Sequence, residues 1–118
     1  KQDIFDVRDA INKIEISESL ERYIIELVYA TRNPKEYKLN EEAEYIQYGV
    51  SPRASINLNL GAKAVAFLAG RDYVLPEDIK EIAYDVMNHR ILLNYEAAAD
   101  GVTAKDIISK ILQKIPIA

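Results

Sequence analysis

The chain has no cysteine and a single histidine, His89, among its 118 residues. Without cysteine, a disulfide framework, a thiol nucleophile and a Cys-ligated zinc site are excluded. One histidine alone cannot provide a two-histidine metal face. The four glycines, Gly49, Gly61, Gly70 and Gly101, begin neither a GxxxxGK[ST] phosphate loop nor a GxGxxG turn. The sequence therefore predicts no metal site and no self-contained active site.

Excess positive charge and long apolar runs are also missing. Fifteen basic and nineteen acidic residues give a net charge of −4, which disfavours a nucleic-acid or anionic-membrane surface. No apolar run reaches the roughly 18–20 residues that span a bilayer, and Lys1-Gln2-Asp3 does not resemble a signal peptide. We therefore expect a cytoplasmic protein with neither a nucleic-acid nor a membrane partner.

The length and the ends of the chain bear on its domain organisation. A chain of 118 residues with 49% hydrophobic residues is suited to one domain around one core. It lacks an initiator methionine, opens in a helical pattern and ends at Ile115-Pro116-Ile117-Ala118. We expect residues 1–118 to be a single domain excised from a longer protein.

Apolar residues at helical spacing predict about five helices. The first is expected over 3–14, and the second follows the cap Ser17 and ends before Pro34. The fourth starts at Pro76, and the fifth follows the cap Thr103. The predicted fold class is mainly α, a small bundle of about five helices with at most one short β pair.

The third helix is the most apolar segment of the chain. Ser51 is expected to cap it, Pro52 to be its first residue and Gly70 to end it. Lys63 is the only charged residue between positions 54 and 69. A helix that is apolar nearly all round belongs in the middle of a bundle, so we expect neighbours on several of its sides.

Two connections between these helices are less regular. Residues 34–50 form a long, acidic, tyrosine-rich stretch, in which a short strand is expected at 45–48. Such a loop is either functional or a solvated excursion, and the latter is the favoured interpretation. The strand is expected to pair with residues 72–75, and residues 91–100 are expected to be irregular.

Arg53 is the residue that departs from the usual preferences. A cation in the first turn of a helix opposes the helix dipole by about 0.3–1 kcal/mol. A helix N-terminus offers free backbone N–H groups to an anion, and a guanidinium adds donors suited to phosphate oxygens. The pattern is that of a phosphate sensor. From the residues alone, Arg53 could equally pair with a nearby carboxylate or point to water.

Other cations at helix ends have a simpler explanation. His89-Arg90 follows the fourth helix, where the dipole stabilises positive charge. Arg71-Asp72 follows Gly70 in a helix-ending turn, where the charges can pair locally. We interpret both pairs as structural.

Five short motifs in this order resemble a known family. They are Ala30-Thr31-Arg32, Gly49-Val50-Ser51-Pro52-Arg53-Ala54-Ser55, Gly70-Arg71-Asp72-Tyr73-Val74, Leu75-Pro76-Glu77-Asp78-Ile79 and Asn88-His89-Arg90-Ile91. Together they resemble the C-terminal helical lid domain of MoxR-family AAA+ ATPases over nearly the whole chain. The related lid of magnesium chelatase is the nearest alternative. The resemblance implies an AAA+ lid fold.

The resemblance also implies a role for Arg53. A missing N-terminal portion would carry the nucleotide-binding core, and Arg53 falls on the sensor 2 arginine, which reaches the γ-phosphate of ATP. Arg53 would then be both the catalytic and the cofactor-binding residue, with ATP and Mg bound only in the full-length ATPase. This fragment alone would have no activity. Whether Arg53 serves its own or a neighbour's nucleotide stays open.

The implied partners come from the family as well. MoxR-like proteins form chaperone-like rings, commonly hexamers, often alongside a protein with a von Willebrand factor A domain. Leu75 departs from the family, which often has a capping threonine or serine there, and no role is assigned to residues 35–48. The alternative is a nucleotide-independent helical interaction module that uses the tyrosine-bearing loop. A histone-like DNA-binding piece, suggested by residues 72–79, is disfavoured by the net charge.

Overall fold

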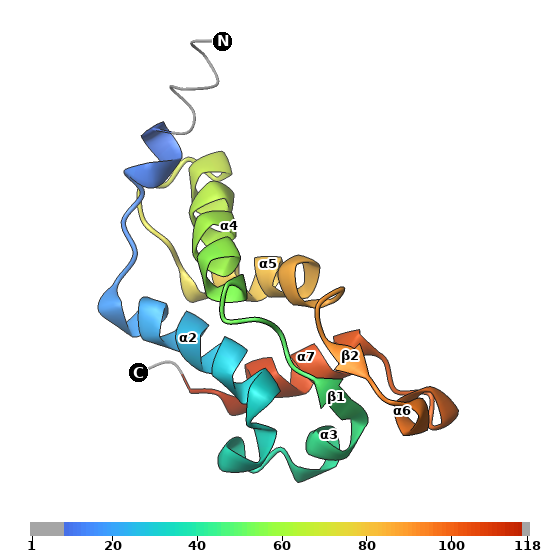
Figure 1. Cartoon of the computed structure of the whole chain (residues 1–118). Helices are drawn as coiled ribbons and strands as arrows, with labels where there is room; N and C mark the ends of the chain where they lie inside the picture. Colours follow the sequence, from blue (N-terminus) through green and yellow to red (C-terminus); the bar gives the residue numbers. More distant parts are fainter. Residues whose placement is uncertain (1–8, 117–118) are drawn as a thin grey trace.

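The computed structural model of the chain describes residues 9–116, and these are mainly helical, as predicted (Figure 1). Four helices are long: α2 (Glu18–Arg32), α4 (Ala54–Leu68), α5 (Pro76–Met87) and α7 (Ala104–Lys114). Three shorter helical segments join them: η1 (Pro34–Tyr37), α3 (Asn40–Tyr45) and α6 (Tyr95–Ala99). Of the helix expected over 3–14, residues 9–12 are helical and residues 3–8 lie outside the described residues.

Local capping explains where the long helices begin and end. The hydroxyl of Ser17 accepts the N–H of Leu20 at 3.2 Å, which confirms the predicted cap of α2. At α7, Thr103 and Asp106 form a reciprocal capping box. Gly70 adopts φ +79° just after α4, the left-handed conformation of a helix-ending glycine. The sequence predicted all three ends.

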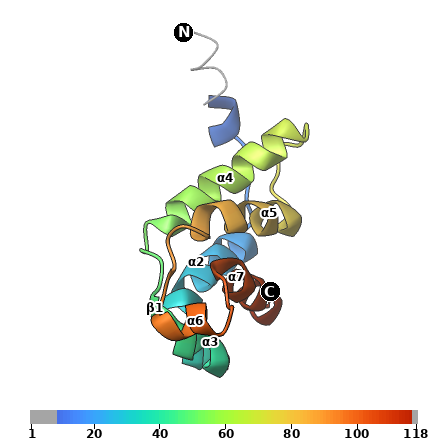
Figure 2. The same ribbon diagram turned by 90° about the vertical axis from the view of Figure 1, so that its right-hand side faces the viewer.

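The long helices pack in two layers around one core. In Figures 1 and 2, α4 and α5 lie above α2 and α7. The closest helix pairing is that of α4 with α5, where a Cβ on Gly61 would lie 2.6 Å from Ile82 Cγ1. The largest fully buried side chains come from all four helices and include Tyr23, Ile24, Leu27, Leu58, Ile79, Met87, Ile107, Ile108 and Ile111.

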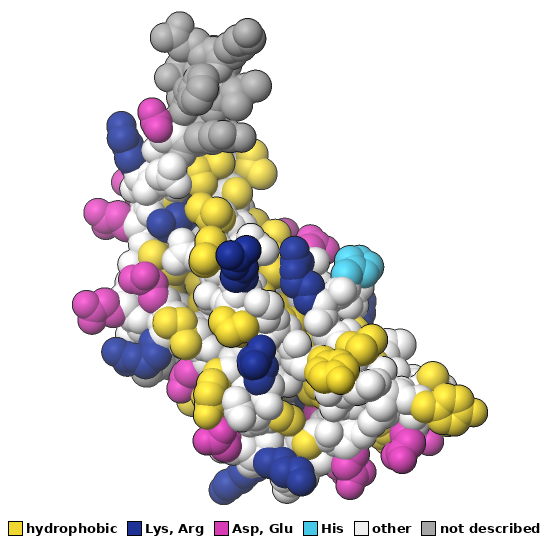
Figure 3. All heavy atoms as spheres, viewed as in Figure 1, with side chains coloured by type: hydrophobic (Ala, Val, Ile, Leu, Met, Phe, Trp, Pro, Cys, Tyr) yellow, Lys and Arg dark blue, Asp and Glu magenta, His cyan; other side chains and the backbone are white. Residues whose placement is uncertain are grey.

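The position predicted for the third helix, α4, is wrong. Its buried residues are Ala54, Leu58, Ala62 and Ala66, a single stripe with four-residue spacing. The larger side chains Ile56, Leu60 and Leu68 are 60%, 45% and 83% exposed, and Figure 3 shows hydrophobic side chains on the surface over α4. The three alanines of the inner stripe allow close packing against α5 and α2, whereas Ile56, Leu60 and Leu68 are left facing outward.

The predicted strand exists, but its predicted partner is wrong. Strand β1 (Ile46–Tyr48) pairs antiparallel with β2 (Leu92–Leu93). Tyr73 instead makes an isolated parallel bridge with Glu15. Helix α4 explains the difference, because fifteen residues at about 1.5 Å each carry the chain some 22 Å away from β1 before residue 72. The chain returns to β1 only after α5.

Residues 34–50 fold into η1, α3 and β1 with Leu39 and Val50 buried and many other side chains exposed, so the expectation of a solvated loop is only partly right. The hydroxyl of Tyr29 donates to Glu36 at 2.7 Å, and the ring of Tyr37 meets that of Tyr29 edge-on with centroids 6.2 Å apart. The hydroxyl of Tyr45 donates to Asp100 at 2.8 Å, and this links α3 to the end of α6. The segment expected to be irregular at 91–100 thus contains β2 and α6.

Candidate functional site

Arg53 lies at the N-cap position of α4, one residue before the first helical residue. Ser51 was predicted to cap this helix and Pro52 to begin it, and both lie instead in the turn before it. The hydroxyl of Ser51 accepts the N–H of Arg53 at 3.3 Å, two residues along. It therefore closes a local turn and caps nothing inside α4.

The backbone amides at this helix end are already hydrogen-bonded. The N–H groups of Ala54 and Ser55 bond to the carbonyls of Ser51 and Pro52 at 2.9 and 3.2 Å, and that of Ile56 bonds to Arg53 at 3.0 Å. These i to i+3 bonds form a tight opening turn of 3₁₀ type. The hypothesis that free backbone N–H groups at the start of α4 bind an anion is therefore wrong. The guanidinium of Arg53 is the group there that can still donate hydrogen bonds to an anion.

The side chain of Arg53 is exposed. Within residues 9–116 it makes no hydrogen bond or salt bridge, and the one salt bridge there joins Arg71 to Asp78. The carboxylate pairing considered for Arg53 does not occur among these residues. Figure 3 shows some Lys and Arg side chains in the middle of one face and others along its edges, where the acidic side chains also lie. The guanidinium is accordingly open to a ligand from outside the chain.

The last turn of α2 holds the segment that leads to Arg53. Thr31 is 1% exposed, and its hydroxyl accepts the N–H of Val50 at 3.0 Å. A Cβ added to Gly49 would lie 2.4 Å from the carbonyl oxygen of Thr31, so only glycine fits there. The periodicity of the second helix puts Thr31 on the same stripe as its buried apolar residues, and the structure confirms that burial. The contact of its hydroxyl with Val50, which no local pattern reveals, was missed.

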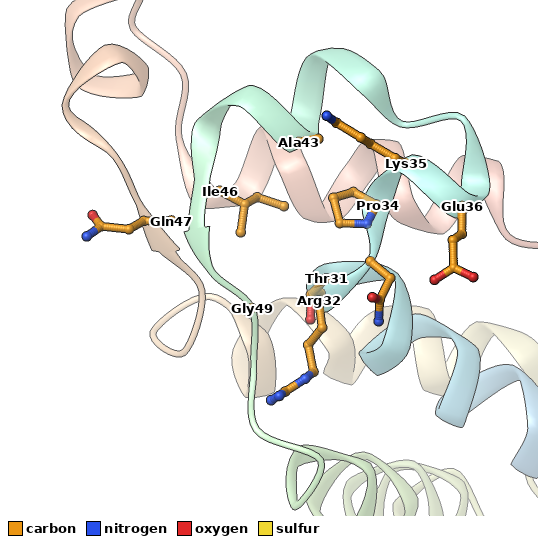
Figure 4. A pocket seen from close by; sticks show the side chains of 10 residues that line it. Thr31, Arg32, Pro34, Lys35, Glu36, Ala43, Ile46, Gln47 and Gly49 are labelled. Atoms are coloured by element: carbon orange, nitrogen blue, oxygen red, sulfur yellow. The ribbon is translucent and has the colours of Figure 1, made fainter.

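A pocket of about 370 Å³ lies beside this contact (Figure 4). Its lining includes Thr31, Arg32, Lys35, Ile46 and Gly49. Figure 4 shows the side chain of Arg32 extending along the segment that follows Gly49. Arg53 is not among the lining residues, so this pocket lies at the joint between α2 and β1 and apart from the α4 terminus.

The other charged residues singled out by the sequence have structural roles. Arg71 binds both carboxylate oxygens of Asp78 at 2.7 Å, which joins the end of α4 to the start of α5. The Arg71 guanidinium, together with the N–H of Leu75, lowers the pKa of Asp78 below its usual value. Arg90 donates to the carbonyl of Val86 in the last turn of α5, in line with the dipole interpretation.

Residues 9–116 contain no catalytic constellation of their own. No group of three His, Cys, Asp or Glu side chains within that range could hold a metal ion. None of the helices described there is long and apolar enough to cross a lipid bilayer. The fold and the site together define a small, mainly helical fold that exposes Arg53 at the start of a helix.

The family follows from comparison with known proteins. The family model of the AAA lid domain matches residues 39–111. The chain belongs to the AAA lid domain family. This confirms the mainly α lid fold inferred from the motifs.

The relatives point to the MoxR group. The chain is 35% identical over 102 residues to "Chaperone MoxR1" of Mycobacterium tuberculosis, covering 86% of this chain and 27% of that protein. It is 37% identical over 107 residues to "Protein MoxR" of Paracoccus denitrificans, covering 86% and 31%. The chain thus spans about a third or less of the length of these relatives.

A solved structure is more similar still. The crystal structure of a "putative ATPase" from Cytophaga hutchinsonii shares 62% sequence identity with the chain and superposes with a TM-score of 0.96. The match covers 99% of this chain and 36% of that one. The MoxR-like resemblance of the sequence is therefore confirmed.

Proposed function

We propose that this chain is the C-terminal lid of a longer MoxR-like AAA+ ATPase and that Arg53 is its sensor 2 arginine. The observation that carries the proposal is the exposed guanidinium at the start of α4, which has no partner among residues 9–116. The match to the AAA lid domain and the relatives named "putative ATPase" and MoxR chaperone support the γ-phosphate of ATP as the proposed ligand of that group.

The chemistry assigned to Arg53 is electrostatic. Phosphoryl transfer depends mainly on positioning and on stabilising charge on phosphate oxygens. The guanidinium fits one such oxygen because its N–H donors form a planar fork. The described residues hold no carboxylate cluster for Mg, so Mg and most nucleotide contacts are assigned to the core of the longer protein. Contact with the γ-phosphate lets the lid orientation report the nucleotide state.

The same proposal covers the assembly. Residues 1–118 are taken as one lid domain joined to an N-terminal AAA+ core in a cytoplasmic, chaperone-like ring, a homo-hexamer in full length. A von Willebrand factor A domain protein is the proposed accessory partner. The net charge of −4 supports the absence of a nucleic-acid partner. These parts rest on the relatives and not on any contact within the chain.

Substitution of Arg53 in the full-length protein tests the proposal. We expect Arg53→Ala to lower ATP turnover about a hundredfold, the usual loss when one preorganised donor to a transition-state oxyanion is removed. Arg53→Lys retains the charge without the fork, so its turnover should be intermediate. Turnover is measured as phosphate release at saturating ATP.

Lys63→Ala is the matched control, because it removes the other cation of α4 and should leave turnover unchanged. Wild-type turnover of Arg53→Ala would refute the proposed role.

The interaction-module alternative has less support in the structure. Of the three tyrosines between 37 and 48, Tyr37 packs on Tyr29 and Tyr45 bonds to Asp100, which leaves Tyr48, 64% exposed, to present a contact. Sequencing the gene upstream of Lys1 separates the two functions. A Walker A loop there supports the lid, whereas an unrelated upstream domain supports the module.

A further inference from the structure

We propose that Thr31 is a positioning residue for Arg53. By holding the backbone of Val50, its side chain sets where the guanidinium lies. The inference rests on the proposed function of Arg53, and it adds a residue on a different helix, outside the span matched by the family model.

The hydroxyl of Thr31 makes two hydrogen bonds. It donates to the carbonyl of Val28 at 2.7 Å, within α2, and accepts the N–H of Val50 at 3.0 Å. The first bond fixes the direction of the hydroxyl hydrogen, so a lone pair is left to face Val50. Both Thr31 and Val50 are buried, at 1% and 0% exposure. Without the hydroxyl, the Val50 N–H would be left unpaired away from water.

The backbone of Gly49 and Val50 is packed closely against the end of α2. Gly49 lies so close to α2 that a Cβ would meet the carbonyl oxygen and carbon of Thr31 at 2.4 and 2.6 Å. The next residue, Arg32, reaches the carbonyl of Val50 with Nη1 at 3.5 Å. Successive residues at the end of α2 therefore hold successive groups of the Gly49–Val50 segment.

A short, internally bonded turn transmits this position to Arg53. Ser51 follows Val50 directly, and its hydroxyl and carbonyl accept the N–H groups of Arg53 and Ala54 at 3.3 and 2.9 Å. The side chain of Arg53 has no contact of its own among residues 9–116 that would hold it. The backbone is therefore what places the guanidinium, and a shift of Val50 moves Arg53 with it.

The test is a double-mutant cycle in the full-length protein. Thr31→Val removes the hydroxyl and keeps the shape, and we expect turnover to fall about tenfold, because a displacement of about 1 Å can cost up to about a hundredfold. Thr31→Ser retains the hydroxyl and should restore most of the turnover. In the Arg53→Ala background, Thr31→Val should cause no further loss, because the group that it positions is absent.

Thr103→Val is the matched control. It removes another threonine hydroxyl that accepts a backbone N–H, that of Asp106 at 3.3 Å, at the start of α7. We expect unchanged turnover. Hydrogen exchange at Val50 checks the mechanism, since Thr31→Val should speed exchange there while the α7 amides stay protected. If Thr31→Val does not fold, Thr31→Ala replaces it in the cycle, because it removes the same hydroxyl and adds no atom to the contact.

The outcomes separate this inference from the proposed function. Wild-type turnover of Thr31→Val, or an equal loss with and without Arg53, would show a merely structural threonine and overturn the inference alone. Wild-type turnover of Arg53→Ala would overturn both proposals. A loss that depends on Arg53 and is rescued by serine supports the inference.

Discussion

At the scale of single residues, the structure separates arginines that hold the fold from Arg53 and Arg22, which are exposed and make no side-chain hydrogen bond or salt bridge within residues 9–116. Arg71 binds the carboxylate of Asp78, and Arg90 binds the carbonyl of Val86 at the end of α5. The side chain of Arg53 binds neither a carboxylate nor a carbonyl within the described chain. Arg53 also lies where the helix dipole disfavours a cation. A residue that contributes no contact and opposes the dipole is better explained by a ligand outside the chain than by folding.

The turnover loss proposed for Arg53→Ala should thus come without a loss of stability. Removing the cation from the helix start should leave the free energy of unfolding unchanged or raise it by up to about 1 kcal/mol. Urea unfolding of the 118-residue chain followed by circular dichroism measures this. A clear loss of stability would mean that the guanidinium has an internal partner.

At the scale of elements, the two acidic caps form a natural comparison. Asp78 accepts the N–H of Leu75 at 2.7 Å and Asp106 accepts that of Thr103 at 2.9 Å, each at the start of a helix. Asp78 additionally binds Arg71 and is 3% exposed. Leu75 has no side-chain acceptor, so the contact that a threonine or serine hydroxyl would make with the Asp78 N–H is missing, and that N–H bonds to the Leu75 carbonyl at 3.0 Å instead.

Asp78 should also make stability depend on pH. Arg71 and the Leu75 N–H lower its pKa in the folded state, so the folded chain binds fewer protons there than the unfolded chain. Its contribution is thus complete above the unfolded pKa, about 3.9, and is lost as pH falls through the lower folded pKa. We expect Asp78→Asn to cost about 1–3 kcal/mol at pH 7 and to flatten the pH dependence below about pH 4.

Asp106→Asn is the matched variant. The pKa of Asp106 is lowered in the same direction by Thr103, but the residue has no ion pair, so its substitution should cost less. Urea unfolding between pH 7 and pH 3 gives both quantities. An equal cost for the two variants would show that the Arg71 pair adds nothing.

At the scale of the whole molecule, the proposed sensor Arg53 is presented without a complete nucleotide site around it among residues 9–116. The amides at the start of α4 are bonded internally, and the pocket of about 370 Å³ does not include Arg53. One exposed guanidinium is too little to hold a solvated triphosphate. Under the proposed function, another part of a longer polypeptide brings the nucleotide to Arg53.

Titration of ATP into the 118-residue chain should therefore give no measurable heat at millimolar ligand. Isothermal titration calorimetry with and without Mg tests this, and the full-length protein serves as the positive control. Saturable heat that disappears in Arg53→Ala would reveal a complete nucleotide site within the chain. It would contradict the proposal that most nucleotide contacts come from the core of the longer protein.

Much of this protein could be predicted because its signals are local. Ser17, Thr103 and Gly70 act on backbone groups within a few residues, and the apolar spacing of α2, α5 and α7 repeats within a helix turn. The family motifs, including Arg53, are contiguous strings of the same kind. Local signals in the sequence therefore predicted the four long helices, most of their ends and the family.

Strand pairing, the packed face of α4 and the contact of Thr31 with Val50 were decided only by the tertiary structure, because each depends on how the helices are placed in space. Strand β1 pairs with β2 and not with residues 72–75, because α4 takes the chain away from β1 and α5 returns it. The nearly uniform apolar pattern of α4 could not indicate which of its faces packs against α5 and α2. The face with three small alanines is the one that packs there. Likewise, only folding brings Thr31 against Val50, nineteen residues later, since a hydrogen bond across such a separation leaves no local pattern in the sequence.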